Sequence, residues 1–413
     1  MAMGDAATRT KSKSSPERRP CGGREDSSSY AEEDEAPRGV VGRVMHFLVN
    51  NQITVPANIL WFLITLHLAL PALREYTTSF IFISYPPGTR EGDESGSYGK
   101  GRLDLCYVFT WVMVFTGLRG VLMKYVFVPG ARVGGVRGVK AQTRFGEQAW
   151  TFMYYAVAWS VGFRLVYDSD YLTSLHAMWA PYPNPLPAEL KRYYLLQLAF
   201  WIHQLIVLHL ERARRDHYAM LLHHLITLAL MSCSYTVDVT RVGNMILVTM
   251  DFADILLPAA KMMKYLNWSK SCDLLFVCFL LAWFVTRHIL FPTIVWSAAV
   301  QAPQIMDPVW DTEKGVYWMH EWFVGFVGLL GVLQVIICWW FWLILKVAYK
   351  VVRGEGAEDN RSDSEDEGQD NDEEEDEKIN GKANGSAKSN GVEKDVQPAR
   401  KRSKRRKGGD TQE

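Results

Sequence analysis

Apolar runs of about 20 residues recur through the middle of this 413-residue chain, and each is long enough to cross a bilayer as a helix. Because a helix satisfies its backbone hydrogen bonds internally, such runs predict helical membrane spans. Eight runs can be separated, at residues 53–73, 105–123, 149–166 and 194–210, two between 216 and 261, and then 274–299 and 322–347. The expected fold class is an all-α polytopic membrane protein with about eight transmembrane helices and disordered polar tails.

The polar tails lower the mean hydropathy of the chain, so the average does not show the apolar middle. The mean hydropathy of the whole chain is −0.06, a value typical of soluble proteins. The first 38 residues contain no apolar core, which favours a disordered cytosolic tail over a signal peptide. We divide the chain into a disordered N-terminal tail, N-terminal transmembrane helices with their loops, a larger membrane domain, and a disordered C-terminal tail. These parts occupy residues 1–45, 46–140, 141–350 and 351–413.

The C-terminal tail is acidic over Glu355–Glu377 and basic over Arg400–Lys407. Ser362 and Ser364 stand in the acidic sequence SDSEDE, which predicts phosphorylation by acidophilic kinases. The simplest interpretation of this tail is a charged, solubilising segment. If the basic run binds a partner, eight spans favour anionic lipid headgroups over a role as a nuclear signal.

Lys and Arg in the short connections predict the orientation, because basic loops stay on the cytosolic side. The connections on one side that are rich in these residues are 124–144, 212–215 and 261–270. The connections on the other side, which hold fewer in proportion to their length, are 74–102, 168–192, 238–241 and 300–321. The first set and both termini are therefore expected to face the cytosol, which agrees with an even number of spans.

The two spans between 216 and 261 carry ionisable side chains, His223 and His224 on the first and Asp251 and Asp254 on the second. Each costs roughly 2.5–3.5 kcal/mol to insert, so such groups usually mark a function or a buried partner. At about 1.5 Å per residue, the two pairs reach similar depths on antiparallel helices. A carboxylate beside an imidazole fixes its tautomer and raises its basicity, as general-base and nucleophilic catalysis both require.

Structural alternatives exist for these residues. The histidines could form hydrogen bonds across helices, and the aspartates could pair with Arg or Lys; Lys261 lies two turns beyond Asp254. The same choice, between lining a cavity and bonding between helices, applies to further polar residues in the spans. These are His203, Gln204, Arg287 and His288.

A metal site is not predicted. Membrane di-iron enzymes need repeated HxxxH and HxxHH boxes to complete two coordination spheres, whereas here a lone His217 precedes the HH pair and no second box follows. A single metal ion on the histidines and aspartates is the remaining alternative.

Several ordered motifs resemble one family. RRDHYAMLLHHLIT, SYT, TRVG, MDFAD and AAKMMKYL are similar to the Lag1 motif of ceramide synthases, which belong to the TLC-domain superfamily. RFGEQAW, YPNPL and KRYYLLQLAFWIHQ extend the resemblance upstream, and CDLLF and RH extend it downstream. It covers roughly residues 140–345, so the domain at 141–350 resembles a TLC catalytic domain. The sequence YYLLQLAFWIHQ is similar to that of fungal members, and the chain also lacks the homeobox-like insertion of animal members.

This resemblance implies an enzyme of the endoplasmic-reticulum membrane that transfers a fatty acyl group from acyl-CoA to a sphingoid base. His223, His224, Asp251 and Asp254 would be its catalytic residues. No cofactor is implied, because acyl-CoA is a substrate. The implied partners beyond substrates and lipids are a small single-span accessory subunit and a homo- or heterodimer with a paralogue.

The resemblance also suggests substrate-binding residues. Arg212, Arg214 and Arg215 are topology determinants or bind coenzyme A phosphates, for which arginine has suitable geometry. Trp150 is either an interface anchor or part of the acyl path. Two other classes remain open: a non-catalytic TLC-domain protein with a lipid-sensing or translocon-associated role, and a transporter, which would usually show an internal repeat that this chain lacks.

Overall fold

A computed structural model describes residues 47, 50–88, 96–210, 216–306, 309–311 and 316–353. All of these except Phe47 belong to one compact unit, residues 48–413. The predicted N-terminal tail, the predicted C-terminal tail from residue 354 onward and the basic run 212–215 lie outside the described residues, whereas residues 351 and 352 belong to the last helix.

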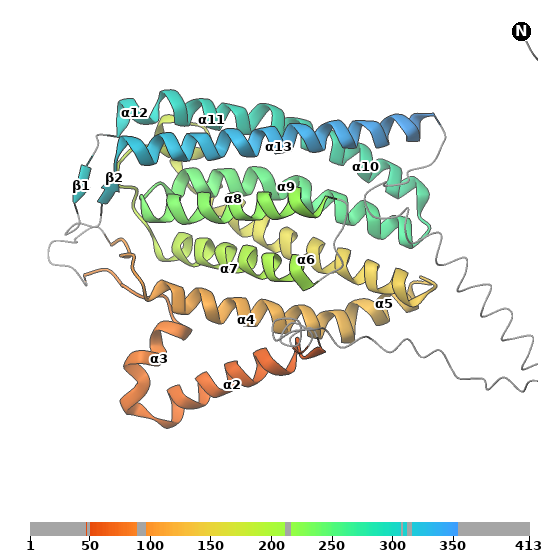
Figure 1. The fold of residues 1–413 in the computed structure, drawn as a ribbon, viewed down its shortest axis with the longest axis horizontal. Helices are drawn as coiled ribbons and strands as arrows, with labels where there is room; N and C mark the ends of the chain where they lie inside the picture. Colours follow the sequence, from red (N-terminus) through yellow and green to blue (C-terminus); the bar gives the residue numbers. More distant parts are fainter. Residues whose placement is uncertain are drawn as a thin grey trace, which may run out of the picture. The chain divides into compact units, whose positions relative to one another are not determined.

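Helices make up most of the described residues (Figure 1). The longer ones are α2 (Thr54–Ala69), α4 (Asp104–Leu122), α6 (Val139–Tyr167), α7 (Ala188–Leu210), α8 (His217–Thr236), α9 (Thr240–Tyr265), α10 (Ser269–Phe284), α11 (Phe291–Val300) and α13 (His320–Val352). The short ones are α3 (Arg74–Ile81), α5 (Val128–Val133) and α12 (Ala302–Ile305), the 3-10 turns η1 (Pro71–Leu73), η3 (Asp170–Leu172) and η4 (His176–Met178), and the π-helical turns η2 (Met123–Phe127) and η5 (Val285–Leu290).

The expectation of a helical polytopic membrane protein is confirmed. Five helical stretches in the described residues are long and apolar enough to cross a membrane: Asp104–Val133, His217–Thr236, Thr240–Tyr265, Ser269–Ile305 and His320–Lys350. Counting a bent pair, Thr54–Ala69 with Pro71–Ile81, raises the number to six. α6 and α7 have 29 and 23 residues, which is long enough, but they are not among the stretches that are also apolar enough.

Two predicted spans differ from straight helices. The span at 53–73 ends at Ala69, and the chain turns by 112° into α3. Pro71 accounts for this bend, because proline removes a helical N–H and clashes with the preceding turn. At 274–299 the helix contains the π-helical turn η5 just before Pro292, and the chain continues through this proline as one stretch from Ser269 to Ile305.

One feature departs from an all-α fold. Strands β1 (Val309–Asp311) and β2 (Val316–Trp318) form a small antiparallel hairpin in which Trp310 pairs with Tyr317. The sequence analysis predicted only a connection at 300–321.

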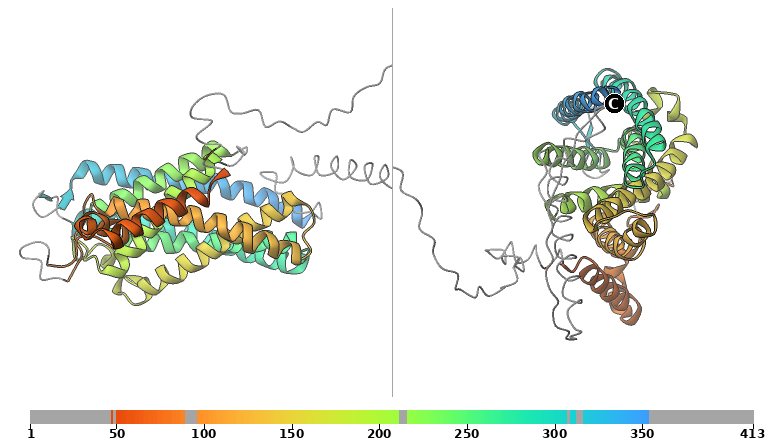
Figure 2. Two further views of the ribbon diagram at one scale, coloured as in Figure 1. Left: turned by 90° about the horizontal axis from the view of Figure 1, so that it is seen from below. Right: turned by 90° about the vertical axis from the view of Figure 1, so that its right-hand side faces the viewer.

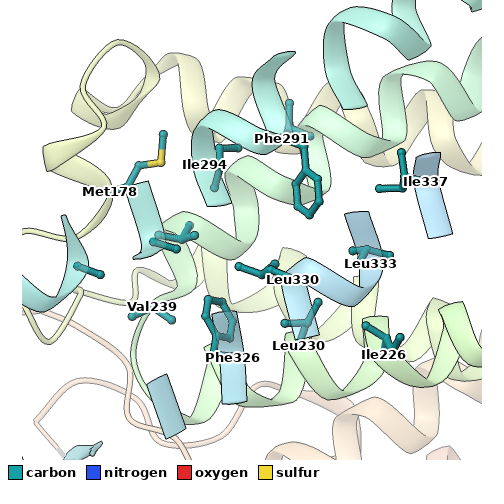
Figure 3. Packing of buried hydrophobic residues seen from close by; sticks show 14 of the residues in the cluster. Met178, Ile226, Leu230, Val239, Phe291, Ile294, Phe326, Leu330, Leu333 and Ile337 are labelled. Atoms are coloured by element: carbon teal, nitrogen blue, oxygen red, sulfur yellow. The ribbon is translucent and has the colours of Figure 1, made fainter. Parts of the chain in front are cut away.

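α9 lies at the centre of the bundle and packs against α6, α8 and α10. The end-on view in Figure 2 shows α4 (orange), α6 (yellow) and α13 (blue) as members of one bundle. On one side of α8, the buried apolar side chains of α8, α11 and α13 interdigitate (Figure 3). They include Ile226, Leu230, Phe291, Leu330 and Leu333.

At the end of the bundle where α4 begins, a buried ion pair ties α4 to α7. Lys191 Nζ lies 2.8 Å from Asp104 Oδ1, and these side chains are 0% and 4% exposed. Lys191 also donates to the carbonyls of Ser84 and Gly99, while the Tyr235 hydroxyl of α8 donates to Asp104 Oδ2. This cluster therefore connects three helices, α4, α7 and α8, with the segment that precedes α4.

Close packing of α9 on α7 depends on Gly243. A Cβ at this position would overlap the hydroxyl and ring of Tyr194, whose hydroxyl is hydrogen-bonded to Ser234. We expect Gly243→Ala to lower the free energy of unfolding by about 1–3 kcal/mol, as for other overpacked cores. Thermal unfolding in detergent measures this. Gly328→Ala on α13, where a Cβ meets nothing within 4 Å, is the matched control and should not destabilise. Equal stability of both variants would contradict the prediction.

Candidate functional site

A cavity of about 390 Å³ lies between α6, α7, α8, α9, α10, η5 and α13. It brings together seven residues that the sequence analysis singled out: His223, His224, Asp251, Asp254, Arg287, Trp150 and Gln204. Apolar side chains from the same helices, including Leu230, Leu247, Phe326 and Leu333, form much of the remaining wall.

Helical periodicity explains how α8 and α9 present one face each to this cavity. On α8 the lining positions are His217, Met220, His223, His224, Thr227, Leu230, Met231 and Ser234. On α9 they include Gly243, Leu247, Asp251, Asp254, Pro258 and Lys261. Steps of three and four residues keep each set on one side of its helix. The ionisable residues are therefore part of two continuous cavity-facing stripes.

The two histidines are held by aromatic rings. Their ring centroids are 5.7 Å apart, and Trp201 of α7 lies 5.4 Å from His223 and 5.3 Å from His224. Trp340 of α13 lies 5.2 Å from His223 on centroids. These edge-to-face contacts restrict both rings without forming hydrogen bonds to them.

His224 has a defined tautomer. Its Nδ1 lies 2.7 Å from the carbonyl oxygen of Met220, one helical turn earlier. A carbonyl only accepts, so Nδ1 must carry the proton and Nε2 of the neutral ring must hold the lone pair. His223 Nδ1 is buried and has no hydrogen-bond partner among the described residues. The pair thus supplies one oriented base and a second ring without a fixed partner.

Asp251 is 1% exposed and is held by a neutral side chain. Its Oδ2 accepts a hydrogen bond of 2.8 Å from Gln197 Nε2, whereas Oδ1 has no partner in the described part of the chain. Asp254 is held differently, because Arg287 Nη2 donates to its Oδ1 at 2.8 Å. Arg287 is itself buried, and its guanidinium carbon lies 4.1 Å from the ring centroid of Trp283.

These contacts revise the expected pairing. The histidines and aspartates share one cavity, but the described residues contain no hydrogen bond between an imidazole and either carboxylate. For Asp254, the alternative of pairing with Arg or Lys is the one observed. Its partner is Arg287 and not the expected Lys261. The π-helical turn η5 carries Arg287, and such turns often occur at functional sites.

Three other predicted residues are placed as follows. His203 is 1% exposed, lies outside the cavity lining and is 3.0 Å from the Thr116 hydroxyl, so it bonds between helices. His288 also lies outside the cavity and packs 4.5 Å from the ring of Phe341. Trp150 lines the cavity and is only 2% exposed, which favours a place on the acyl path over an interface anchor. Arg212, Arg214 and Arg215 lie outside the described residues.

The sequence analysis missed the α7 and α13 side chains that position the site. Gln197 and Trp201 are one helical turn apart on α7, and Trp340 of α13 contacts His223, as Trp201 does. A glutamine four residues before a tryptophan in an otherwise apolar span is a usable signal, because a buried amide requires partners. The described residues contain no group of three or more His, Cys, Asp or Glu arranged to hold a metal ion.

Comparison with known proteins places this architecture in a family. Residues 144–346 match the TLC-domain family model. The sphingosine N-acyltransferase lag1 of Schizosaccharomyces pombe is 42% identical over 71% of this chain and 74% of its own length. Ceramide synthase LAG1 of Saccharomyces cerevisiae is 34% identical over 69% of each chain, and bovine ceramide synthase 4 is 34% identical over 53% of this chain and 54% of its own. This chain therefore belongs to the Lag1-type ceramide synthase family of TLC-domain proteins.

Proposed function

We propose that this protein is a ceramide synthase that joins a fatty acyl group from acyl-CoA to the amine of a sphingoid base. The observation that carries the proposal is one apolar cavity that holds His223, His224, Asp251 and Asp254. The family relationship supports the enzyme over the non-catalytic alternative, since the relatives are named as N-acyltransferases and synthases.

The reaction requires removal of protons from a cationic nucleophile. A sphingoid amine has a pKa similar to that of lysine, about 10.4, so it is mostly an ammonium ion near neutral pH. The nitrogen must lose one proton before it attacks the thioester carbon and a second when the amide forms. One of these protons ends on the sulfur of coenzyme A as the C–S bond breaks, and the other leaves to solvent.

His224 Nε2 is the group that we assign to proton transfer, because its lone pair is fixed by the bond from Nδ1 to Met220. The same lone pair could first attack the thioester and carry the acyl group as an acyl-imidazole. Both routes need an apolar enclosure, since water would hydrolyse an activated acyl group. Trp201 and Trp340 lie against the histidines, and Trp150 adds apolar wall to the same cavity.

Substrate binding completes the proposal. We assign the fatty chain to the apolar walls of the cavity and the coenzyme A phosphates to Arg212, Arg214 and Arg215. Gln204 and Arg287 are the polar lining residues that we assign to substrate contact. His203 and His288 are not assigned to it, because neither lines the cavity. No cofactor is required for this chemistry.

A two-substrate assay tests the function. Purified protein should release coenzyme A only when acyl-CoA and a sphingoid base are both present, and mass spectrometry should identify the ceramide. A non-catalytic relative would release none, and a transporter would move a lipid without forming an amide bond.

We further propose that α6 and α7 also cross the membrane, that the protein has eight spans with both termini in the cytosol, and that it resides in the endoplasmic reticulum. Two observations support the additional spans: both helices line the cavity beside α8 and α9, and at about 1.5 Å per residue each exceeds 30 Å in length. A small accessory subunit and a dimer with a paralogue are proposed partners on the basis of the family resemblance alone.

The orientation makes a prediction about glycosylation. Asn267 lies in the turn between α9 and α10 and begins the acceptor sequence Asn-Trp-Ser. In the proposed orientation this turn is cytosolic, so Asn267 stays unmodified in cells. Glycosidase treatment should therefore not change the mass of the protein. If glycosidase lowers the mass of the wild-type protein but not of Asn267→Gln, the turn is lumenal. The proposed orientation would then be wrong, and the histidines would lie near the lumenal face.

A further inference from the structure

Asp251 offers the cavity a hydrogen-bond acceptor that no described residue uses. Its carboxylate is 1% exposed and lines the cavity, and Oδ1 has no partner, while Oδ2 accepts from Gln197. Leaving a buried acceptor without a donor is unfavourable, and more so when the acceptor is charged. A bound ligand with a donor at this point would remove that cost.

The charges around the cavity indicate the kind of donor. Arg287 neutralises Asp254 at 2.8 Å, whereas Asp251 accepts a hydrogen bond from a single described residue, the neutral amide of Gln197. A buried carboxylate without a cation is strongly unfavourable, and a cationic ligand compensates it best. Of the two proposed substrates, the sphingoid base brings an ammonium group. The thioester of acyl-CoA has only acceptors, and its phosphates are anionic.

We propose that Asp251 Oδ1 binds the ammonium group of the sphingoid base, and that Gln197 and Tyr154 are positioning residues that aim this oxygen into the cavity. This inference rests on the proposed function and adds which carboxylate selects the amine. It assigns Asp251 to the substrate and not to an imidazole, which agrees with the lack of a histidine–aspartate bond among the described residues.

Tyr154 determines which way the Gln197 amide faces. The Tyr154 hydroxyl donates to Gln197 Oε1 at 2.7 Å, so Nε2 must point to the other side. There Nε2 donates to Asp251 Oδ2 at 2.8 Å and to the Tyr193 hydroxyl at 3.0 Å. A reversed amide would place Oε1 against the carboxylate, which would repel it. Neither Gln197 nor Tyr154 lines the cavity, so both can act only through Asp251.

The test compares the KM values of the two substrates in full-length protein. Gln197→Leu removes the donor to Asp251, and a lost hydrogen bond to a charged group corresponds to about tenfold or more in affinity. We expect the KM for the sphingoid base to rise by that factor, while the KM for acyl-CoA stays unchanged. Asp251→Asn should raise the KM for the base further, by about 30-fold or more, as for a broken buried charge pair.

Tyr154→Phe provides a second and milder variant, because it keeps the ring that stacks on Phe200. It should raise the KM for the base less than Gln197→Leu does. If Tyr154 acts through Gln197, the double variant should be no worse than Gln197→Leu alone. This variant also decides the proposal should Gln197→Leu fail to fold.

Two matched controls remove comparable hydrogen bonds away from the cavity. Gln142→Leu removes a buried amide that donates to the Val136 carbonyl, and Tyr235→Phe removes a hydroxyl that donates to Asp104. Neither should change either KM. Equal rises in both KM values for the Gln197 and Tyr154 variants would overturn the proposal, as would a loss of kcat alone, which would indicate that Asp251 acts on a histidine. Wild-type protein without acyl transfer would instead refute the proposed function.

Discussion

His224→Ala and His223→Ala are each expected to lower acyl transfer per folded molecule by at least about 10²-fold, the low end for removing a positioned acid–base group. His224 carries the lone pair that the Met220 carbonyl orients, and His223 lies beside it with centroids 5.7 Å apart. Both should still insert into the membrane, because replacing an ionisable side chain with alanine lowers the cost of insertion. Turnover measured against the amount of folded protein gives the comparison.

A packing role for the histidines makes the opposite prediction. Trp201 and Trp340 contact the rings, so an alanine variant could lose aromatic contacts and yield less protein with normal specific activity. His320→Ala, at the exposed start of α13, is the control for histidine loss as such and should retain full turnover. Near-normal turnover in both cavity variants would end the assignment to proton transfer.

Hydropathy predicted helix positions well where a span is apolar throughout. The predicted run at 322–347 falls within α13, and the run at 105–123 matches α4 to within one residue at each end. Both runs are apolar enough that a helix is the structure expected for them in a bilayer. It did not predict the bend after Ala69, because a hydropathy average does not include the direction of the helix axis. It also did not predict the hairpin of β1 and β2, since three-residue strands leave almost no periodic signal.

The site was predicted by residue type and depth, but not by contact. Axial rise places His223 and Asp254 at a similar level, and both line the cavity. Which groups bond depends on how each helix is rotated and on its neighbours. Arg287 reaches Asp254 from a π-helical turn, and Gln197 reaches Asp251 from α7. Neither contact follows from spacing along α8 and α9 alone.

Removing one charge of the ion pair between Lys191 and Asp104 is expected to give the largest loss of stability. Asp104→Asn leaves the Lys191 ammonium 0% exposed and 2.8 Å from a neutral group. Its remaining contacts among the described residues are backbone carbonyls and the aromatic rings of Tyr85 and Tyr98. Breaking a buried pair in this way typically costs about 3–5 kcal/mol, because the remaining charge is no longer compensated. Thermal unfolding of the detergent-solubilised protein measures the change.

The double variant Lys191→Met with Asp104→Leu separates charge from packing. It removes both charges and keeps apolar volume, so it should unfold at a higher temperature than Asp104→Asn. The exposed pair of Arg164 and Asp168 on α6 is the matched control, with side chains 83% and 62% exposed. Asp168→Asn should change stability by less than about 1 kcal/mol, as for other surface pairs. If Asp104→Asn were as mild as Asp168→Asn, the buried pair would not hold α4 to α7, and the carbonyls of Ser84 and Gly99 would be sufficient for Lys191.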